Sequence, residues 1–392
     1  MKTAYIVSPL RSAVGKAFRG SLRHKRPDDL AADVIRAVLQ KTPEFPRDRI
    51  DDVILGCAMP EAEQGMNVAR FALLLAGLPE SVPGVTINRF CSSGLQTIAM
   101  AADRIRTGDD HCILAGGAES MTMVPMMGNK VVGSRTVMDG HPEFYLGMGL
   151  TAENVAKDYA VSREDQDGFA LESHRRACKA LADGVFEKEI APVPVSFRRP
   201  GPDGDVIIED RIFTVDEGPR ADTSMEALGK LKPAFNPRGS VTAGNASQMS
   251  DGAAMCLVCS EEFVKEFDLQ PVARFVGFAV AGVAPRVMGI GPIAAIPKVL
   301  KKVGLQISDI DRIELNEAFA SQAVAVIKEL GLDPAWVNPT GGAVALGHPL
   351  GATGAKLTAS VIHGLHRDNQ KYGMVTMCIG TGMGAAGVFE RM

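Results

Sequence analysis

The stretch RIDDVILG, residues 49–56, returns almost position for position as DIDRIELN at residues 309–316. In both places it follows a segment whose apolar residues recur at helical spacing, residues 28–42 before the first strand and 292–305 before the second. Strands that alternate with helices are typical of mostly parallel sheets covered by helices on both faces. The repeat therefore predicts an α/β protein built from two copies of one unit.

The repeat continues through three further pairs of segments. Within each pair the elements follow in the same order. Catalytic groups on equivalent turns of two such copies can meet between the copies, beyond the carboxyl ends of the strands. The pairs are GVTINRFCSSG (84–94) with the longer segment 336–365, CILAGGAES (112–120) with VTMCIGTGM (375–383), and SDGAAMCLVCS (250–260) with GMGAAGVFERM (382–392).

The two copies differ by one long insertion. The last two segments are contiguous in the second copy, whereas residues from about 121 to 241 separate them in the first. The insertion contains a helical segment in which Ser162 and Asp165 are placed as a capping pair and Gly184 follows the end. The predicted domains are an N-terminal half of residues 1–120 and 242–269, an inserted, lid-like domain of residues 121–241, and a C-terminal half of residues 270–392.

The composition argues against several classes of protein. A net charge of −4 gives no basic excess for nucleic-acid binding, and no apolar run is long enough to span a bilayer. The first residues lack the apolar core of a signal peptide, and the closing GVFERM is not a peroxisomal address. Seven scattered cysteines do not suggest a disulfide framework. We expect a cytoplasmic protein that neither inserts into membranes nor binds nucleic acid.

Cys91 stands where a repeated strand passes into a helix. The unpaired N–H groups at a helix N-terminus stabilise a thiolate, so the position predicts that the pKa of this thiol falls from about 8.5 toward 7. The small residues that follow, Ser92, Ser93 and Gly94, leave room for a substrate. From the position alone, an inert buried cysteine is an equally good interpretation.

His348 lies in the glycine-rich segment GGAVALGHPLGATG, residues 341–354. Pro349 can begin the helix that follows it. Core packing explains such a histidine poorly, because the glycines around it offer no side chains to pack against. The segment therefore favours a functional histidine.

Two further candidate groups occupy strand ends in the second copy. Cys378 ends an apolar strand and precedes Gly380, in a glycine run whose backbone N–H groups can serve as oxyanion donors. Asn316 follows another strand and could be a helix N-cap. Its counterpart in the first copy is Gly56, so the fold itself does not require a polar side chain there. A role in the site is the favoured interpretation for both residues.

Other patterns give no support for a cofactor site. Cys256 and Cys259 have the spacing of metal ligands, but residues three apart in a strand face opposite sides, so we expect core cysteines. The glycine-rich segments match neither a phosphate-binding loop nor a dinucleotide-binding fingerprint. We predict no metal site and no permanently bound cofactor.

Eight motifs together resemble the thiolase family over nearly the whole chain. The resemblance implies the thiolase fold, an α/β fold with duplicated halves in a five-layer α/β/α/β/α arrangement and an inserted loop domain that covers coenzyme A. That fold agrees with the repeat and the insertion described above. The motifs are NRFCSSGLQ, GMGLTAENVA, KLKPAF, TAGNASQMSDGAA, VMGIGP, NEAFASQA, GGAVALGHPLGATGA and MCIGTGMGAA.

The resemblance also implies a role for each matching residue. Cys91 is expected to accept the acyl group, His348 to activate it, and Cys378 to act as acid and base at the substrate α-carbon. Asn316 is expected to position a water molecule in one oxyanion hole beside His348, and the backbone N–H groups of Cys91 and Gly380 to form a second hole. For coenzyme A the matching positions are Met148, Arg220, Ala243, Ser247, Met288 and Phe319.

The function that this resemblance implies is acyl transfer by a degradative 3-ketoacyl-CoA thiolase. Coenzyme A then cleaves a 3-ketoacyl-CoA to acetyl-CoA and a shortened acyl-CoA, reversibly and through an acyl-cysteine, as in fatty-acid β-oxidation. Coenzyme A and acyl-CoA are substrates, and a homodimer or homotetramer is expected, with docking to a β-oxidation partner subunit left open.

Two other functions stay open at this point. One is a biosynthetic acetoacetyl-CoA thiolase, although members of that class typically carry a histidine where this chain has Gly147. The other, from a different class, is a non-catalytic acyl-CoA or lipid carrier of thiolase shape. The intact set of Cys91, His348 and Cys378 argues against a carrier.

Overall fold

The computed structural model describes residues 2–203 and 205–392. Most of its strands join into one sheet in the order β11-β12-β13-β10-β1-β9-β5-β3-β4, with β2 beside β9 and β6 beside β1, while β7 and β8 form a separate hairpin. The strands are β1 (Tyr5–Ser12), β2 (Gly15–Lys16), β3 (Asp52–Gly56), β4 (Gly84–Ile87), β5 (Cys112–Ser120), β6 (Ile190–Ala191), β7 (Val193–Pro200), β8 (Val206–Phe213), β9 (Ser250–Cys259), β10 (Ala273–Gly282), β11 (Arg312–Leu315), β12 (Tyr372–Ile379) and β13 (Met383–Arg391).

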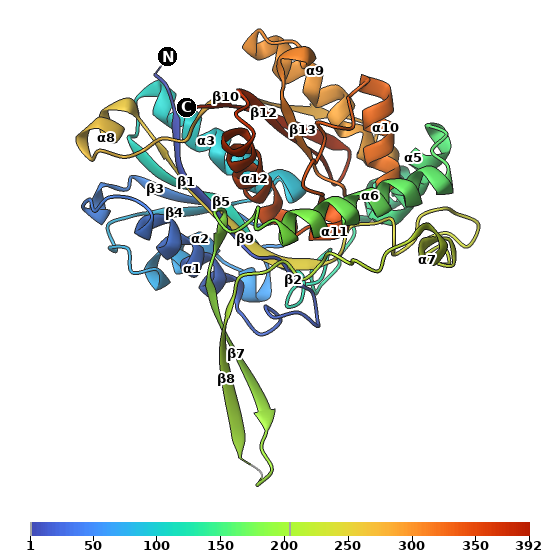
Figure 1. Ribbon diagram of the computed structural model, residues 1–392, viewed down its shortest axis with the longest axis horizontal. Coiled ribbons are helices and arrows are strands. Elements are labelled where there is room, and N and C mark those ends of the chain that lie inside the picture. Colours follow the sequence, from blue (N-terminus) through green and yellow to red (C-terminus); the bar gives the residue numbers. More distant parts are fainter. Residues whose placement is uncertain (1, 204) are drawn as a thin grey trace.

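Helices cover both faces of this sheet and fill its middle (Figure 1). The α-helices are α1 (Pro27–Gln40), α2 (Val68–Leu75), α3 (Ser93–Thr107), α4 (Arg135–Gly140), α5 (Met148–Asp158), α6 (Arg163–Ala182), α7 (Met225–Gly229), α8 (Glu261–Glu266), α9 (Gly291–Val303), α10 (Ala320–Leu330), α11 (Ala343–Leu346) and α12 (Thr353–Arg367). Short 3₁₀ turns are η1 (Arg47–Arg49), η2 (Ala62–Gln64), η3 (Phe90–Ser92), η4 (Pro142–Tyr145), η5 (Pro285–Ile290), η6 (Ile307–Asp309) and η7 (Leu350–Ala352).

Local sequence signals set the ends of these helices. At the start of α6 the side chain of Ser162 accepts a hydrogen bond from the backbone N–H of Asp165 at 3.0 Å, and the Asp165 carboxylate accepts one from the N–H of Ser162 at 3.1 Å. This confirms the predicted capping pair. Helix α3 ends at Gly108, whose φ of 85° is left-handed and therefore suits glycine.

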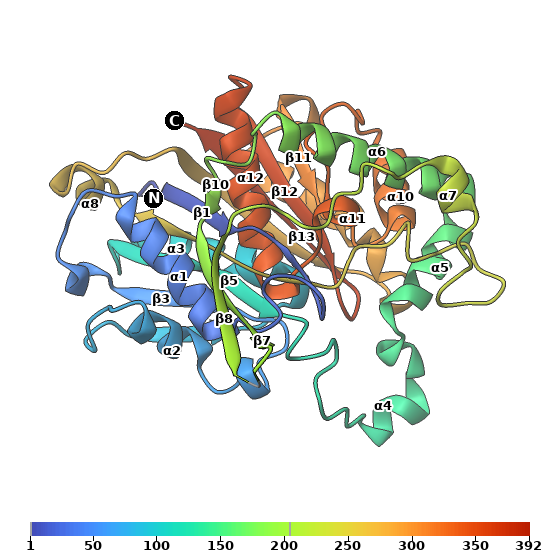
Figure 2. The same ribbon diagram turned by 60° about the horizontal axis from the view of Figure 1, so that its bottom comes forward.

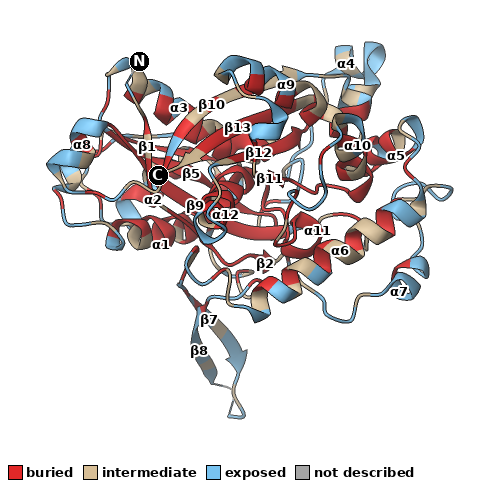
Figure 3. Ribbon diagram, turned by 45° about the horizontal axis from the view of Figure 1, so that its top comes forward, coloured by how far each residue is buried: buried red, intermediate tan, exposed pale blue. Residues whose placement is uncertain are grey.

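The helices and strands form five layers that are held together by three apolar cores. One core packs α1 and α2 on the outer face of β3, β5 and β9, and another packs α9 and α10 on the outer face of β11, β12 and β13. The core between them surrounds α3 and α12 and takes strand residues from both halves of the sheet. Figure 3 shows these inner strands as buried. The arrangement confirms the predicted α/β/α/β/α layers.

The strand registers confirm that the two halves are copies of one unit. One constant offset along the chain relates β3 to β11, β5 to β12, and the segment η3–α3 to η7–α12, and we call it the repeat offset. It carries Val53 to Ile313, Leu114 to Met374 and Ser93 to Thr353. The Cα partners that establish it are Val53 opposite Leu114 opposite Leu257 in the first copy, and Ile313 opposite Met374 opposite Val388 in the second.

Two parts of the sequence alignment between the copies are wrong. The sequence pairs residues 250–260 with 382–392 and hence Leu257 with Phe389, whereas the register makes Val388 the counterpart of Leu257. The sequence also pairs Cys112 with Val375 and hence Ala115 with Cys378, whereas the register makes Ala118 the counterpart of Cys378. The errors arise because these short strands consist largely of glycine, alanine and small apolar residues, which offer few distinctive side chains to align.

The two central helices approach each other at glycines. A Cβ atom on Gly94 would lie 2.7 Å from the backbone nitrogen of Ala355, and one on Gly354 would lie closer still to the backbone nitrogen of Leu95. Real Cβ atoms do not approach backbone so closely, so only glycine allows α3 and α12 to cross here. Because Cys91 precedes α3 and His348 precedes α12, this crossing places the two turns that carry them next to each other.

Between β5 and β9 the chain makes an excursion that contains α4 to α7 and β6 to β8. In this excursion α5 and α6 lie against α10 (Figure 2). The β7–β8 hairpin extends away from the layers (Figure 1). The hairpin exposes Val206, Ile208 and Ile212.

Replacing Gly354 by Ala is expected to lower the free energy of unfolding by about 1–3 kcal/mol, because the added methyl group overpacks the helix crossing. Gly168→Ala is the matched control, since it lies within α6 and its added Cβ would meet nothing within 4 Å. The control should keep or raise stability by about 0.5–1 kcal/mol. Urea unfolding of both variants measures the difference, and equal effects would contradict the close crossing.

Candidate active site

Cys91 lies in the turn η3, where it is buried with 8% of its surface exposed. Burial raises the pKa of the thiol to about 12, although the backbone N–H groups of Gly380 and of Cys91 itself act in the opposite direction. The sequence-based prediction of a lowered pKa is therefore wrong in its net direction. The N-terminal N–H groups do favour the thiolate, but the loss of water around the sulfur outweighs them.

Cys378 lies next to this thiol. It is fully buried, and both this burial and the nearby Cys91 sulfur raise the pKa of the Cys378 thiol. The N–H of Gly380, which follows closely in the chain, interacts with the Cys91 sulfur. The structure thus brings together three of the predicted groups from segments at opposite ends of the chain.

His348 is held at both ring nitrogens. Its Nε2 lies 3.3 Å from the amide nitrogen Nδ2 of Asn316, and its Nδ1 lies 2.6 Å from the hydroxyl oxygen of Thr353. The Thr353 hydroxyl also donates to the carbonyl oxygen of Pro349 at 3.1 Å. Because an amide N–H can only donate, Nε2 accepts in this arrangement and Nδ1 carries the proton. The nitrogen that faces the site is therefore the basic one.

The imidazole of His348 is uncharged. Burial lowers its pKa to about 3, and the positive charge of Lys356 contributes in the same direction. Its backbone N–H donates to the Ser250 hydroxyl at 3.2 Å and to the carbonyl oxygen of Gln248 at 3.3 Å, which fixes the turn. A neutral imidazole can act as a general base toward a neutral thiol.

Asn316 completes this part of the site. The residue is fully buried, and its backbone N–H donates to the carbonyl oxygen of Thr376 at 2.9 Å. Its side-chain oxygen Oδ1 has no hydrogen-bond partner among residues 2–203 and 205–392. A buried amide with one free oxygen can accept a hydrogen bond from a bound molecule while its nitrogen faces His348.

Three residues predicted to contact coenzyme A surround Cys378. Met148, Met288 and Phe319 share one apolar cluster with it, although they come from α5, η5 and the start of α10. The cluster forms because the excursion folds back against the second half of the molecule. It gives the Cys378 thiol an apolar wall on one side.

The other predicted contacts lie further out. Ser247 is half-buried, and its backbone N–H donates to the carbonyl oxygen of Ala318 at 3.0 Å. Ala243 is exposed and lies in the same loop, shortly before Ser247 in the chain. Arg220 is exposed and lies outside the cluster around Cys378. Its backbone N–H donates to Nδ1 of the buried His174 at 3.1 Å, which holds the loop that carries the guanidinium.

Sequence reasoning missed several residues that shape the site. Thr353 orients the ring of His348, and Gln248 donates its side chain to the carbonyl oxygens of Gly218, Val344 and Ala345 at 3.1–3.2 Å. The ring of Phe235 meets that of Phe319 edge-on, with centroids 5.9 Å apart. Thr353 and Gln248 stand within two of the motifs that resemble the thiolase family, so their sequence positions could have identified them as site residues.

Each candidate group exists in only one of the two copies. The repeat offset gives every group a counterpart on the equivalent turn of the other copy. None of these counterparts repeats the chemistry of its partner. Cys91 corresponds to Gly351, His348 to Asn88, Asn316 to Gly56 and Cys378 to Ala118.

The cysteines of β9 are core residues, as predicted. The sulfur of Cys256 lies 3.6 Å from the carbonyl oxygen of Ala115, and the sulfur of Cys259 lies 3.8 Å from that of Cys112. Over the described ranges 2–203 and 205–392, no three His, Cys, Asp or Glu side chains gather as a metal site. Over the same ranges no helix is long and apolar enough to cross a membrane.

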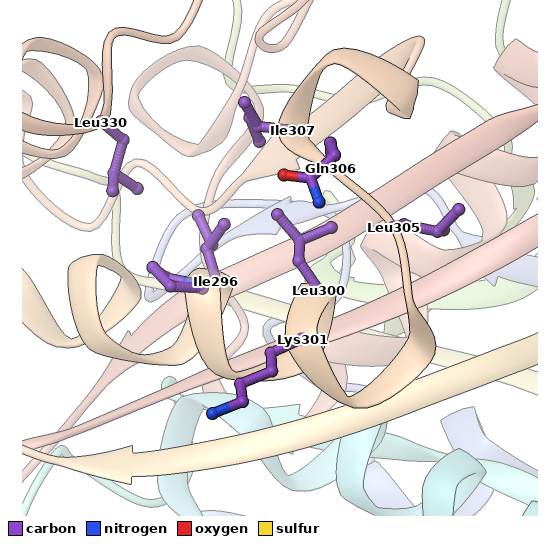
Figure 4. Close-up of a pocket in the computed structure, with 8 residues that line it drawn as sticks. Ile296, Leu300, Lys301, Leu305, Gln306, Ile307 and Leu330 are labelled. Carbon is purple, nitrogen blue, oxygen red and sulfur yellow. The ribbon is translucent and has the colours of Figure 1, made fainter.

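A cavity of about 380 Å³ lies on the outer side of the second half, remote from these groups (Figure 4). Its lining is mostly apolar and contains no cysteine, serine, histidine or carboxylate. The lining residues are Ile296, Pro297, Leu300, Lys301, Leu305, Gln306, Ile307 and Leu330.

Comparison with known proteins gives two family matches that together span the chain. The model described as thiolase, N-terminal domain matches residues 4–262, and the model described as thiolase, C-terminal domain matches residues 269–391. Among curated relatives, the chain is 54% identical over 390 residues to a 3-ketoacyl-CoA thiolase of Bacillus subtilis, and 45% identical over 417 residues to a beta-ketoadipyl-CoA thiolase of Pseudomonas putida. Both alignments cover 100% of each chain.

Solved structures give the same result for the fold. The acetyl-CoA acetyltransferase of Bacillus anthracis superimposes with a TM-score of 0.90 at 42% identity, covering 100% of this chain and 99% of that one. The dimeric peroxisomal thiolase of Saccharomyces cerevisiae gives a TM-score of 0.89 at 40% identity, covering 100% and 98%.

Replacing His348 by Gln is expected to make folding less sensitive to acid. The pKa of His348 is lowered to about 3 in the folded protein, whereas an unfolded histidine has a pKa of about 6.5, so the unfolded chain binds the proton first. The stability due to this difference is complete above pH 6.5 and is lost as the pH falls toward 3. Between pH 7 and pH 5 the loss is about 2 kcal/mol.

Urea unfolding of the wild type and of His348→Gln at the two pH values measures this difference. The loss of free energy of unfolding on acidification should be smaller in the variant. His24→Gln, at an exposed side chain, is the control and should lose as much as the wild type. Equal losses in all three proteins would show that the ring of His348 is not held neutral by burial.

Proposed function

The chain belongs to the thiolase family and has the acyltransferase activity of a 3-ketoacyl-CoA thiolase, and on this premise we propose the residues that carry out its reaction. The observation that supports the assignment is that the thiols of Cys91 and Cys378 lie together. The turn η3, which carries Cys91, packs against η7, which follows the neutral imidazole of His348. Cys91 is the acyl-accepting nucleophile, His348 is its base, and Cys378 is the acid and base at the substrate α-carbon.

In the first step the Cys91 sulfur adds to the keto carbon of a 3-ketoacyl-CoA while its proton passes to Nε2 of His348. The resting pair is uncharged, because burial raises the pKa of Cys91 to about 12 and lowers that of His348 to about 3. Charge therefore develops only as the carbon–sulfur bond forms. The backbone N–H groups of Cys91 and Gly380 are placed to stabilise the oxyanion, and one such donor contributes on the order of 10²–10³ in rate.

In the second step the C2–C3 bond breaks and leaves an acyl group on Cys91. Acetyl-CoA departs as an enolate, which takes a proton from the Cys378 thiol. The raised pKa of Cys378 keeps this proton on the sulfur until the enolate forms. A water molecule held by Asn316 and His348 donates to the thioester oxygen as negative charge accumulates there.

In the last step a second coenzyme A gives its thiol proton to the Cys378 thiolate and attacks the acyl-cysteine. The shortened acyl-CoA leaves, and the Cys91 thiolate regains its proton from His348. Every step is an acyl or proton transfer and the three groups return to their starting states, so coenzyme A enters as a substrate and no permanent cofactor is required.

Coenzyme A lies, in this proposal, between the second half and the inserted domain of residues 121–241. Met148, Met288 and Phe319 provide the apolar wall along which the pantetheine arm reaches Cys378. The exposed guanidinium of Arg220 faces the anionic nucleotide end, with Ala243 and Ser247 on the loop between. The division of the rest into residues 1–120 with 242–269 and residues 270–392 remains a prediction.

We propose that the molecule works as a homo-oligomer in the cytoplasm. The edge strand β4 ends the sheet, and α2, β4 and α3 leave large apolar side chains exposed on this flank. Such a flank suits pairing with a second copy, and the yeast relative is described as dimeric. No surface is assigned to a β-oxidation partner subunit. The exposed side chains are Phe71, Leu74, Leu75, Val85 and Met100.

Cys378→Ala is expected to lower kcat for thiolysis by about 10²–10⁴-fold, because it removes the general acid and base. The same variant should still be alkylated at Cys91 by iodoacetamide, since the nucleophile and its base remain. Steady-state rates and intact-mass spectrometry measure the two effects. Loss of alkylation in a folded Cys378→Ala variant would contradict separate roles for the two thiols.

The control for this experiment is Cys91→Ser. Wild-type protein mixed with a 3-ketoacyl-CoA should show an acyl adduct by mass, and Cys91→Ser should show none. An adduct that survives this substitution unchanged would place the nucleophile elsewhere. A wild type without any adduct would favour the non-catalytic carrier.

A series of 3-ketoacyl-CoA substrates separates the degradative function from acetoacetyl-CoA synthesis. Gly147 stands where the biosynthetic class typically carries a histidine, and it has no side chain that could limit the length of a bound acyl chain. The space around it is open, because an added Cβ would meet nothing within 4 Å. We expect kcat/KM for medium-length acyl chains to exceed that for acetoacetyl-CoA by at least about tenfold, which is about 1.4 kcal/mol of transition-state binding. A maximum at acetoacetyl-CoA would favour the biosynthetic alternative.

A further inference from the structure

Glu119, near the end of β5, is a fully buried carboxylate that the reaction described above does not use. Its oxygen Oε2 accepts from the backbone N–H groups of Ala58 at 2.7 Å and Gly351 at 2.8 Å. Its oxygen Oε1 accepts from the N–H of Met59 at 3.2 Å and from the side-chain amide of Gln64 at 2.6 Å. All four of these partners are donors.

This arrangement of donors favours the ionised form of the carboxylate. A protonated carboxyl group would have to point its O–H at a group that also donates. Burial raises the pKa of Glu119, while the hydrogen bonds from Ala58, Gln64, Gly351 and Met59 oppose that shift. Gly351 lies in η7, directly before α12, where the helix dipole also favours negative charge.

The repeat explains why a cradle for an anion exists at this place. The repeat offset makes Gly351 the counterpart of Cys91 and Ser120 the counterpart of Gly380. The N–H groups of Cys91 and Gly380 form the proposed oxyanion hole. At the equivalent place the N–H of Gly351 donates to Glu119, and the N–H of Ser120 donates to the side-chain oxygen of Gln64 at 2.6 Å.

The fold therefore builds the same pair of N–H donors twice. One pair faces the reacting atoms, and the other pair is satisfied from within by Glu119 and Gln64. The second cradle is closed to substrate because its donors already have buried partners. A carboxylate there takes the place that the substrate oxyanion takes in the first cradle.

Glu119 also links the turns that carry the two catalytic groups. On one side Ala58 accepts at its carbonyl oxygen from the Asn88 amide at 2.9 Å, and the Asn88 oxygen accepts from the N–H of Phe90 at 2.7 Å, next to Cys91. On the other side Gly351 follows His348 within the same turn. A continuous chain of hydrogen bonds thus runs from the Cys91 turn through Glu119 to the His348 turn.

From this chain we infer that Glu119 is a positioning residue, which holds the Cys91 turn and the His348 turn at the separation that the reaction needs. The inference rests on the proposed roles of Cys91 and His348. Its positioning effect passes through the backbone of Ala58 and Gly351, while its negative charge also contributes to the raised pKa of the Cys91 thiol. A misplacement of about 1 Å between reacting groups can cost about 10²-fold in rate.

Glu119→Gln tests the inference most directly. The amide is nearly the same size, but its NH₂ group must face two N–H donors whichever way it turns. We expect kcat for thiolysis to fall about 10²-fold. KM for coenzyme A should change less than twofold, because the proposed coenzyme A residues lie on other segments. Asp52→Asn, a carboxylate-to-amide change at the opposite end of β3, is the control and should keep the wild-type kcat.

A charge swap supplies a readout that a merely structural role would not move. In the double variant Glu119→Gln with Gln64→Glu, the new carboxylate at position 64 accepts from the amide at 119, whose oxygen can then turn to Ala58 and Gly351. The carboxylate still accepts from the N–H of Ser120, but it loses the hydrogen bond that the Gln64 amide donates to the carbonyl oxygen of Met59 at 2.9 Å, so the recovery of kcat is expected to be partial. We expect kcat to recover at least tenfold relative to Glu119→Gln. A double variant as slow as the single one would overturn the inference, as would a folded Glu119→Gln variant with kcat within threefold of the wild type.

If Glu119→Gln does not fold, Glu119→Asp decides. It keeps the charge, but its side chain is one methylene too short to bridge both turns, so kcat of the folded variant should again fall at least tenfold. A folded Glu119→Asp variant with wild-type kcat would overturn the inference. Formation of the acyl adduct on Cys91 in wild-type protein is measured alongside, so failure of the inference is distinguishable from failure of the proposed function.

Discussion

The close crossing of α3 and α12 at Gly94 and Gly354 is the constraint on which the rest of the structure depends. Because backbone meets backbone there, the turns that precede the two helices are pressed together between the two halves of the large sheet. The side chains of Cys91, His348 and Cys378 are all buried there, away from bulk solvent. That burial keeps the thiols and the imidazole uncharged at rest, with their pKa values moved away from neutrality in opposite directions.

The duplication gives this junction two equivalent turns from each copy, yet the catalytic set is assembled once. Cys91 comes from the first copy, whereas Asn316, His348 and Cys378 come from the second. The positions that would complete a second catalytic set hold residues without that chemistry. Ala118, for example, is the counterpart of Cys378 in the first copy. A symmetric scaffold therefore carries an asymmetric site, and the unused cradle becomes available for a structural anion.

Much of this could be predicted from the sequence, because strand ends and glycine turns are local features. Cys91, Cys378 and Asn316 stand at strand ends of the repeated unit and His348 in a glycine-rich turn, and the repeat itself indicated that they would meet. The pKa of Cys91 could not be predicted, since desolvation depends on segments far away in the chain. Glu119 was missed for the same reason: its partners at residues 58, 64 and 351 become neighbours only in the folded protein.

The raised pKa of Cys91 is compatible with catalysis, because the burial that raises it also strengthens the hydrogen bonds from the backbone N–H groups of the oxyanion hole. A permanent thiolate in this site would need a positively charged partner. The positive charge of Lys356 instead acts on His348, whose pKa it lowers. A neutral pair avoids that cost at rest, and charge appears only when a substrate oxygen can receive it. In a dry site each N–H donor then acts on that oxygen with little competition from water, because the local dielectric is low. The burial that opposes the thiolate thus also strengthens the stabilisation of the oxyanion that follows from it.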